Sequence, residues 1–166
     1  MHILINKKYL TYEDYKVKCA IGKRGIGYKR KEGDSITPKG LFNIKYILYR
    51  KDRINKIQSN IKKFTIKKEM GWCDDPRSKH YNKLVKLPFT YRYEKLYRKE
   101  NIYDIIIVLN YNMNPIIKKK GSAIFIHIAK KNYKKTEGCI AVKKIHLLKI
   151  LKKLKKNTKV KIENRI

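Results

Sequence analysis

The sequence GSAIFIHIAKKNYKKTEGCIAV, residues 121–142, holds the clearest local pattern in the chain. Ala123 to Ala129 is an apolar run of strand length, and a lysine-rich loop follows it. Gly138 then opens a second apolar segment that ends at Val142. This order predicts two buried strands joined by a polar loop. The loop can fold back and bring His127 of the first strand close to Cys139 at the start of the second.

A cysteine and a histidine in this arrangement are candidates for nucleophilic catalysis. A thiol needs a base or a nearby imidazolium to react as the thiolate. Gly138 leaves room for a substrate carbonyl and permits a turn that points backbone N–H groups at its oxygen. The alternative is a buried structural cysteine beside an unrelated core histidine, since free cysteine is among the most buried residue types.

Alternation and helical spacing outside this stretch predict a mainly β chain with one or two short helices. Period-two patterns and apolar runs predict further strands at 2–6, 15–21, 42–48, 103–109 and 158–162. Lys143 to Lys156 is the clearest helix, because Leu147, Leu148, Leu151 and Leu154 form an apolar stripe beside lysines. The stripe fits either packing on the sheet or a membrane-surface or nucleic-acid-binding helix. The segments 51–68 and 76–86 are polar and carry no predicted element.

The charge is strongly positive, with 44 Lys and Arg against 13 Asp and Glu among 166 residues. Lys, Ile, Tyr and Asn, whose codons are A/T-rich, supply 86 of these residues, so genome composition explains much of the bias. The other interpretation is an anionic partner such as nucleic acid, acidic lipid or a cell-wall polymer. Basic residues in nucleic-acid-binding domains cluster and favour arginine, whereas here lysine is spread along the chain, so no specific nucleic acid is expected.

Cysteine usage and the N-terminus exclude several classes. Three cysteines without a Cys-x-x-Cys pair indicate neither a disulfide framework nor a structural zinc site, and no metal or cofactor is expected. No run approaches the ~20 apolar residues of a transmembrane helix. The apolar run within residues 1–10 is too short to be the hydrophobic region of a signal peptide. As written, the chain is expected to be cytoplasmic, or exported by a route that the sequence does not reveal.

Several ordered motifs resemble the L,D-transpeptidase (YkuD-type) family. His127 followed by Thr136-Glu-Gly-Cys139 is similar to the family's catalytic motif. The stretch from Gly22 to Phe42, with Asp34-Ser-Ile-Thr-Pro-Lys-Gly-Leu-Phe42, is similar to its glycine turn and D-x-x-T-P-x-G-x-F element. Further blocks resemble a compact, mostly proteobacterial branch that is a lone catalytic domain: Gly71 to Pro76, Tyr81-Asn82, Leu96-Tyr-Arg98 and Tyr103-Asp104.

The resemblance implies a role for each matching residue. Cys139 would attack the carbonyl of a peptidoglycan tetrapeptide stem and form a thioester, and His127 would move the proton. The backbone carbonyl of Ile128 would orient the imidazole. Backbone N–H groups around Gly138, Cys139 and Ile140 would form the oxyanion hole, and Thr136 would support the turn or contact the substrate. Transfer to an amine would make the protein a transpeptidase, and transfer to water an L,D-carboxypeptidase.

Residues outside the motif are expected to complete substrate binding. Family members commonly carry Arg or Asn two residues after the cysteine, where this chain has Ala141. The contact to a substrate carboxylate is therefore either missing or supplied by Arg77, Arg92 or Arg98. Trp72 and Asp74 either wall the cleft and bind the amine of a diamino-acid stem, or fill the core and cap a turn. Cys73 is expected to be a buried spectator.

Together these observations predict one mainly β domain over residues 1–166, a sandwich of mixed sheets of the L,D-transpeptidase type with a C-terminal amphipathic helix. Its expected partners are peptidoglycan stem peptides, with electrostatic attraction to anionic polymers, and it is expected to be a monomer. The resemblance implies a place in the periplasm or cell envelope. The rival hypothesis is a catalytically idle basic domain that binds an anionic polymer or nucleic acid.

Overall fold

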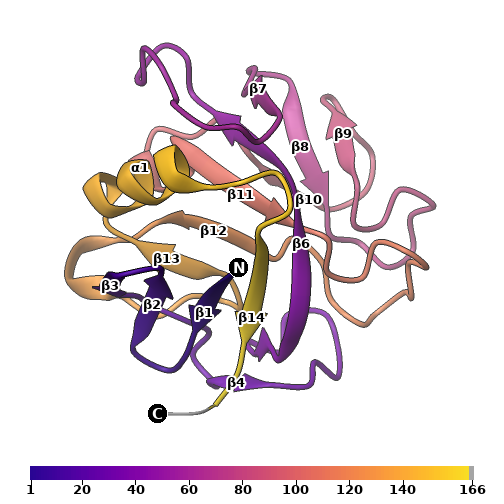
Figure 1. The fold of residues 1–166 in the computed structure, drawn as a ribbon. Helices are drawn as coiled ribbons and strands as arrows, with labels where there is room; N and C mark the ends of the chain where they lie inside the picture. The colour runs from indigo at the N-terminus through magenta and orange to yellow at the C-terminus, as the bar shows by residue number, and fades with distance from the viewer. Residues whose placement is uncertain (165–166) are drawn as a thin grey trace.

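The computed structural model describes residues 1–164, in which strands predominate and one α-helix lies near the C-terminus (Figure 1). The prediction of a mainly β fold with mixed sheets and a C-terminal helix is confirmed. The strands of the first half are β1 (His2–Ile5), β2 (Tyr9–Tyr12), β3 (Tyr15–Lys18), β4 (Ile26–Gly27), β5 (Thr37–Pro38), β6 (Gly40–Tyr49), β7 (Lys63–Thr65) and β8 (Met70–Cys73). The remaining elements are β9 (Leu84–Lys86), β10 (Tyr93–Lys95), η1 (Asn101–Tyr103), β11 (Ile105–Leu109), β12 (Phe125–Ile128), η2 (Lys131–Tyr133), β13 (Ile140–Val142), α1 (Lys144–Lys153) and β14 (Lys159–Ile162).

The largest sheet is mixed and curls back on itself. Its strands follow the order β13-β12-β11-β6-β14-β1-β2-β3, with β7 paired to β6. The pairs β12–β13 and β1–β14 are parallel, whereas β11 pairs antiparallel with both of its neighbours. Ala20, two residues after β3, forms an antiparallel bridge with Ala141 in β13 at the other end of the sheet. The two ends of the sheet therefore meet, and the segment that follows β3 lies beside the start of β13.

Strand β11 carries apolar residues on both faces because both faces are covered. Ile105 and Ile107 belong to the larger core, which also holds residues of β1, β2, β14 and α1. Ile106 and Val108 belong to a second core with Trp72, beneath the three-stranded sheet β10-β8-β9. A strand buried on both faces shows a continuous apolar run rather than alternation, as this one does.

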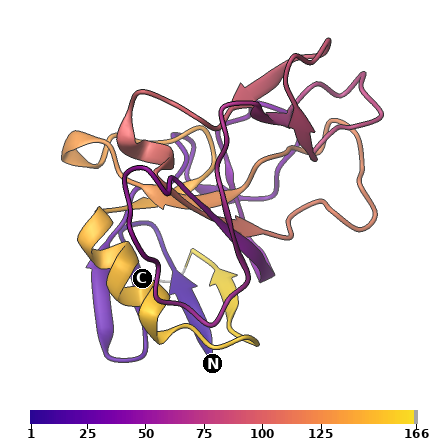
Figure 2. The ribbon, with the colours of Figure 1, turned by 90° about the horizontal axis from the view of Figure 1, so that it is seen from above.

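The helix packs its apolar stripe against the larger core. Leu147, Ile150, Leu151 and Leu154 are buried there and Leu148 packs at its edge. The packing interpretation of the stripe is thus confirmed over the membrane-surface one, although the helix is shorter than predicted and ends at Lys153. Figure 2 shows α1 on the side of the molecule opposite the three-stranded sheet. Among residues 1–164, no helix has the length and apolar character needed to cross a bilayer.

Two segments differ from the sequence-based expectation. Residues 76–86 were expected to be a loop, but Leu84–Lys86 form β9, which pairs with β8. The stretch Gly71 to Pro76 was expected to be a turn or cleft wall, but its first half is β8. These strands are short, and they form because they pair with each other in a small sheet rather than because each carries a long periodic pattern.

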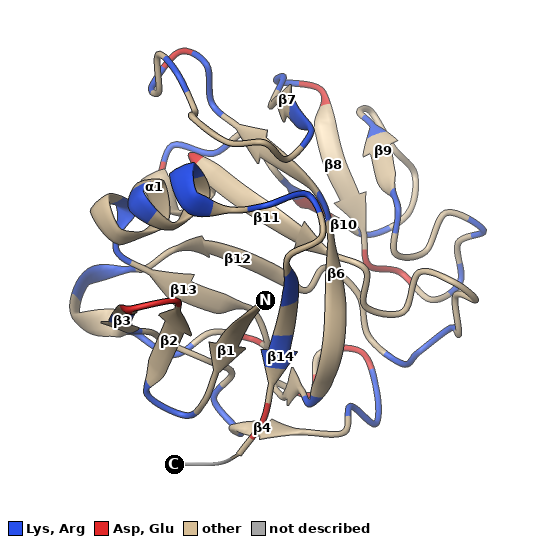
Figure 3. Cartoon of the chain, in the orientation of Figure 1, with Lys and Arg blue, Asp and Glu red and all other residues tan. Residues whose placement is uncertain are grey.

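Basic residues are distributed over strands, loops and helix alike (Figure 3).

Candidate active site

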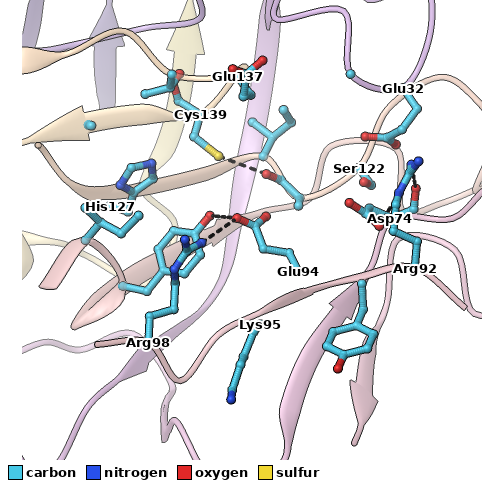
Figure 4. Close-up of a pocket in the computed structure, with 18 of the residues that line it drawn as sticks. Glu32, Asp74, Arg92, Glu94, Lys95, Arg98, Ser122, His127, Glu137 and Cys139 are labelled. Carbon is cyan, nitrogen blue, oxygen red and sulfur yellow. Dashed lines mark hydrogen bonds and ion pairs between the residues drawn. The ribbon is translucent and has the colours of Figure 1, made fainter. Parts of the chain in front are cut away.

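Strands β12 and β13 place His127 and Cys139 on one face of the sheet. In the parallel register His127 lies opposite Ala141, and Cys139 precedes Ala141 by two residues. Side chains two apart on a strand point to the same face, so the thiol and the imidazole share one. That face carries the second core, against which Cys139 packs. Figure 4 shows both side chains at one pocket.

The two residues are offset along the strands. The Cys139 thiol donates to the carbonyl oxygen of Ala123 at 3.1 Å, and its sulfur accepts the N–H of Phe125 at 3.4 Å. No hydrogen bond joins the thiol to His127 within the described part of the chain, and the expected approach of the two side chains during the reaction stays a prediction. The register sets this offset, and two residues along a strand span about 7 Å of backbone.

The imidazole of His127 is held by a backbone carbonyl at the end of its own strand and by an aromatic ring. Its Nδ1 lies 2.9 Å from the carbonyl oxygen of Ile128, the contact that the family resemblance implied. A carbonyl oxygen only accepts, so Nδ1 carries the proton and Nε2 is left as the basic nitrogen. The ring of Tyr103 packs edge-on against the imidazole, with centroids 5.3 Å apart. The histidine is therefore fixed in both tautomer and orientation.

Burial keeps both groups uncharged at neutral pH. Burial lowers the pKa of His127 to about 4, with Lys130 and Arg98 acting in the same direction against the Ile128 hydrogen bond. Burial, assisted by the Glu94 carboxylate, raises the pKa of Cys139 to about 12. A thiolate–imidazolium pair would need the opposite order of pKa values. The resting pair is thus a neutral thiol and a neutral base.

The turn before Cys139 is braced from two sides. Gly138 has a φ of +139°, and a side chain there would meet the carbonyl oxygen of Ile36 at 2.9 Å. The Thr136 hydroxyl accepts the Gly138 N–H at 3.1 Å and donates to the Cys139 carbonyl at 2.5 Å, so Thr136 supports the turn. The buried Thr37 hydroxyl donates to the Gly138 carbonyl and accepts the Gly22 N–H, both at 2.8 Å. The T-P-x-G element thereby holds the cysteine turn in place.

A cleft of about 1320 Å³ runs past the cysteine and the histidine. Thr136, Ala141 and Arg98 line it near them, and Glu32, Asp74, Arg92 and Ser122 line it further along. Glu94 also lines it and accepts the Tyr103 hydroxyl at 2.6 Å, with Arg98 at 3.5 Å. Burial raises the pKa of Glu94 against the opposing effects of these two partners. The arrangement can bind a polar, extended substrate beside a thiol.

Two side chains predicted to contact the substrate, those of Trp72 and Arg77, lie elsewhere. Trp72 is 1% exposed, packs edge-on against Phe125 and donates its indole N–H to Asn82 at 3.0 Å. It fills the core rather than walling the cleft. Arg77 pairs with Asp75, has an 81% exposed side chain and does not line the cleft. The side chain of Ile140 is buried in the larger core, because Ile140 alternates with the cleft-facing Cys139 and Ala141.

Asp74 lines the cleft, which is one of the two positions that the sequence left open, and other residues of the cleft were not predicted. Glu94 lines the cleft, is one of only 13 acidic residues and stands two residues before the Leu96 to Arg98 block, so the sequence held a signal for it. Thr37 belongs to the D-x-x-T-P-x-G-x-F element, and its hydrogen bond to the cysteine turn was not predicted. Ser122 had no sequence signal, since its position depends on the backbone turn at Gly121 and Ala123. Cys19 and Cys73 are both buried.

Comparisons with known proteins bear on the family and the fold of this chain. The model of the L,D-transpeptidase catalytic domain family, YkuD, matches residues 2–162. Among solved structures, the helical cell shape determining protein Pgp2 from Campylobacter jejuni is similar in fold, with a TM-score of 0.53 and 19% identity. The alignment covers 99% of this chain and 48% of that one, so the chain spans about half its length. A mutant of the same protein aligns with a TM-score of 0.45, 22% identity and coverage of 99% and 47%. No curated protein sequence matches.

Proposed function

Since the chain belongs to the L,D-transpeptidase catalytic domain family, we propose that it is a cysteine-dependent acyltransferase acting on peptidoglycan stem peptides. The observation that carries the proposal is the joint placement of a thiol and a correctly oriented imidazole on one wall of a large cleft. Localisation in the periplasm or cell envelope follows as part of the same proposal, because the substrate lies there.

The reaction begins with the neutral pair. The sulfur of Cys139 turns from the Ala123 carbonyl to the carbonyl carbon of the stem peptide while Nε2 of His127 takes the thiol proton. The resulting oxyanion is stabilised by backbone N–H groups of the turn at Cys139. The carbon–nitrogen bond then breaks, the proton passes from His127 to the departing amine, and a thioester remains on Cys139.

The second half of the reaction returns the enzyme to its resting state. An acceptor amine attacks the thioester carbonyl, and His127 takes a proton from that amine. The carbon–sulfur bond breaks, the acyl group leaves on the new amide nitrogen, and the proton returns to the sulfur. With water as acceptor the same steps release a free carboxylic acid, so the acceptor alone separates transpeptidase from carboxypeptidase.

Mass spectrometry of the protein treated with a carbapenem tests the proposal. We expect one covalent adduct on the parent protein, none on Cys139→Ala, and an unchanged adduct on Cys73→Ala, whose thiol is buried. Turnover of a muropeptide tetrapeptide should vanish in Cys139→Ala, and His127→Ala should acylate slowly. An adduct that persists in Cys139→Ala would assign the nucleophile to another residue.

A further inference from the structure

The wall of the cleft contains a buried lysine that lies outside the catalytic motif. Lys29 stands in the loop between β4 and β5, is 8% exposed and lines the same cleft as Cys139. Lysine is rarely buried in proteins unless its charge is paired. The Lys29 ammonium group forms an ion pair with the buried carboxylate of Asp34, and it also donates to the Ile36 carbonyl at 3.2 Å. The cleft wall therefore holds a fixed positive charge.

Asp34 is the counter-charge that keeps this lysine buried. Its Oδ2 accepts the Arg30 N–H at 2.8 Å, and its Oδ1 accepts the Ile36 N–H at 3.1 Å. Burial acts to raise the pKa of Asp34, but the hydrogen bonds from Lys29 and from these two backbone N–H groups lower it overall, so the carboxyl group is ionised at neutral pH. Buried charges are screened much less by salt than exposed ones.

The Lys29 side chain packs against the segment whose carbonyl holds the thiol. A Cβ at Gly121 would collide with Lys29 Cε and would lie 3.0 Å from Cδ, so the lysine passes directly over this glycine. Gly121 stands two residues before Ala123, and the Ala123 carbonyl accepts the Cys139 thiol at 3.1 Å. The lysine therefore lies on one of the two segments that position the nucleophile.

The ammonium group also contacts the segment behind the cysteine turn. The Ile36 carbonyl that accepts its N–H lies 2.9 Å from the position of a Cβ at Gly138. Gly138 directly precedes Cys139, so this carbonyl touches the turn that carries the thiol. Lys29 thus joins both segments that position Cys139, although the three regions are far apart in the sequence.

The charge of Lys29 acts on the thiol. Burial and the Glu94 carboxylate raise the pKa of Cys139 to about 12, whereas a backbone hydrogen bond and the Lys29 ammonium lower it. Glu94 of β10, Tyr103 of η1 and His127 of β12 also line the pocket around the thiol. Negative charge develops at the sulfur when the imidazole takes its proton, and the Glu94 carboxylate opposes this. A cation at the same pocket offsets that opposition.

We infer that Lys29 is a positioning residue of the acylation step, in which its fixed charge stabilises the negative charge that develops at Cys139. The inference rests on the proposed function. Charges that are in place before the reaction starts stabilise a transition state without reorganisation, and they act most strongly where water is excluded. Asp34 fixes the ammonium group in that place. The pair thereby supplies a positive charge that the neutral His127 imidazole does not supply at rest.

Alkylation of Cys139 by iodoacetamide, a neutral probe, tests the charge independently of the proposed function. The variant Lys29→Met/Asp34→Asn removes both charges together, so that neither group is left as an unpaired buried charge. We expect alkylation at pH 8 to be about threefold to tenfold slower than in the parent protein, because Lys29, and not Asp34, is among the groups that act on the thiol. The difference should persist when salt is added, since the pair is buried.

Two further variants separate the charge from packing. Asp34→Asn keeps the ammonium group and removes its counter-charge, so alkylation should be about twofold to fivefold faster than in the parent protein. A lysine that only braced the loop would give slower alkylation in this variant too. Lys131→Met is the matched control, because it removes the same charge from an exposed lysine of η2, where solvent screens it. Its alkylation rate should match that of the parent protein.

Release of terminal D-alanine from a muropeptide tetrapeptide connects the charge to the reaction. In Lys29→Met/Asp34→Asn we expect kcat to fall by about tenfold with little change in KM, because the charge acts on the transition state rather than on the bound peptide. An unchanged kcat would overturn the inference. So would a parental alkylation rate in this double variant, or equal slowing in it and in Asp34→Asn.

The remaining outcomes separate folding and function from the role of Lys29. Far-UV circular dichroism checks the fold of each variant. If the double variant does not fold, Asp34→Asn decides, since faster alkylation supports the inference and an equal or slower rate overturns it. If the parent protein neither releases D-alanine nor takes up a carbapenem, the proposed function fails, and the alkylation rates still decide whether the Lys29 charge acts on Cys139.

Discussion

Cys139 lies on the same face of the sheet as His127, two residues out of register on the neighbouring parallel strand. The thiol is held by the Ala123 carbonyl at 3.1 Å and the imidazole by the Ile128 carbonyl at 2.9 Å. The backbone therefore positions each of the two groups separately.

Gly138→Ala is expected to destabilise the fold and abolish turnover. The alanine would have to adopt a φ of +139°, and its Cβ would lie 2.9 Å from the Ile36 carbonyl oxygen. The turn that carries Cys139 must therefore shift. We expect a loss of about 2 kcal/mol or more in the free energy of unfolding. Gly25→Ala is the control, with a φ of +79° and no heavy atom near its Cβ, and it should cost about 1 kcal/mol and keep activity. Denaturant titrations measure both, and equal losses would contradict the proposed clash.

Alkylation of Cys139 by iodoacetamide should be slow at neutral pH and accelerate with pH. Burial raises the pKa of this thiol to about 12, so the thiolate fraction should rise about tenfold per pH unit from pH 7 to pH 10. The rate constant is followed by intact mass, with Cys139→Ala as the blank. A plateau near pH 7 would show a preformed thiolate and argue against the neutral resting pair.

Protonation of His127 should destabilise the fold in acid. Its folded pKa is about 4 and its unfolded value about 6.5, so the unfolded state binds more protons between these values and stability falls as pH drops through that window. The penalty below pH 4 should approach about 3 kcal/mol. In His127→Gln this acid-induced loss of folding stability should be absent. Denaturation curves of both proteins at pH 7 and pH 4 measure the difference. Identical pH dependence in the two proteins would refute the shift.

Tyr103→Phe should lower kcat more than it changes KM. The variant keeps the ring that packs against His127 but removes the hydroxyl that donates to Glu94 at 2.6 Å. We expect kcat to fall by about threefold to tenfold, because the Glu94 carboxylate loses one hydrogen bond while its second partner remains. Tyr103→Leu removes the ring as well and should lose more. If Tyr103→Phe matches the parent protein at all pH values, the Tyr103–Glu94 contact plays no part in catalysis.

The elements with strong local patterns were predictable from the sequence. The apolar run of β11, the alternation of β6 and the leucine stripe of α1 each reflect a period of two or of 3.6, which a single segment carries by itself. The order of His127, Thr136, Gly138 and Cys139 likewise indicated the chemistry, because those residues lie on one strand–loop–strand unit. The short strands β8, β9 and β10 carry no such pattern and were not foreseen.

Only the tertiary structure decided which side chains share the cleft. Trp72 and Asp74 are two residues apart in the sequence, yet one is sealed in the core and the other lines the cleft. Glu32, Glu94 and Ser122 come from distant segments and meet because separate loops and the small sheet close over one face of β12. The alternation along a strand determines which residues share a face of the sheet. Which other segments pack on that face depends on long-range contacts, and no local sequence pattern encodes those contacts.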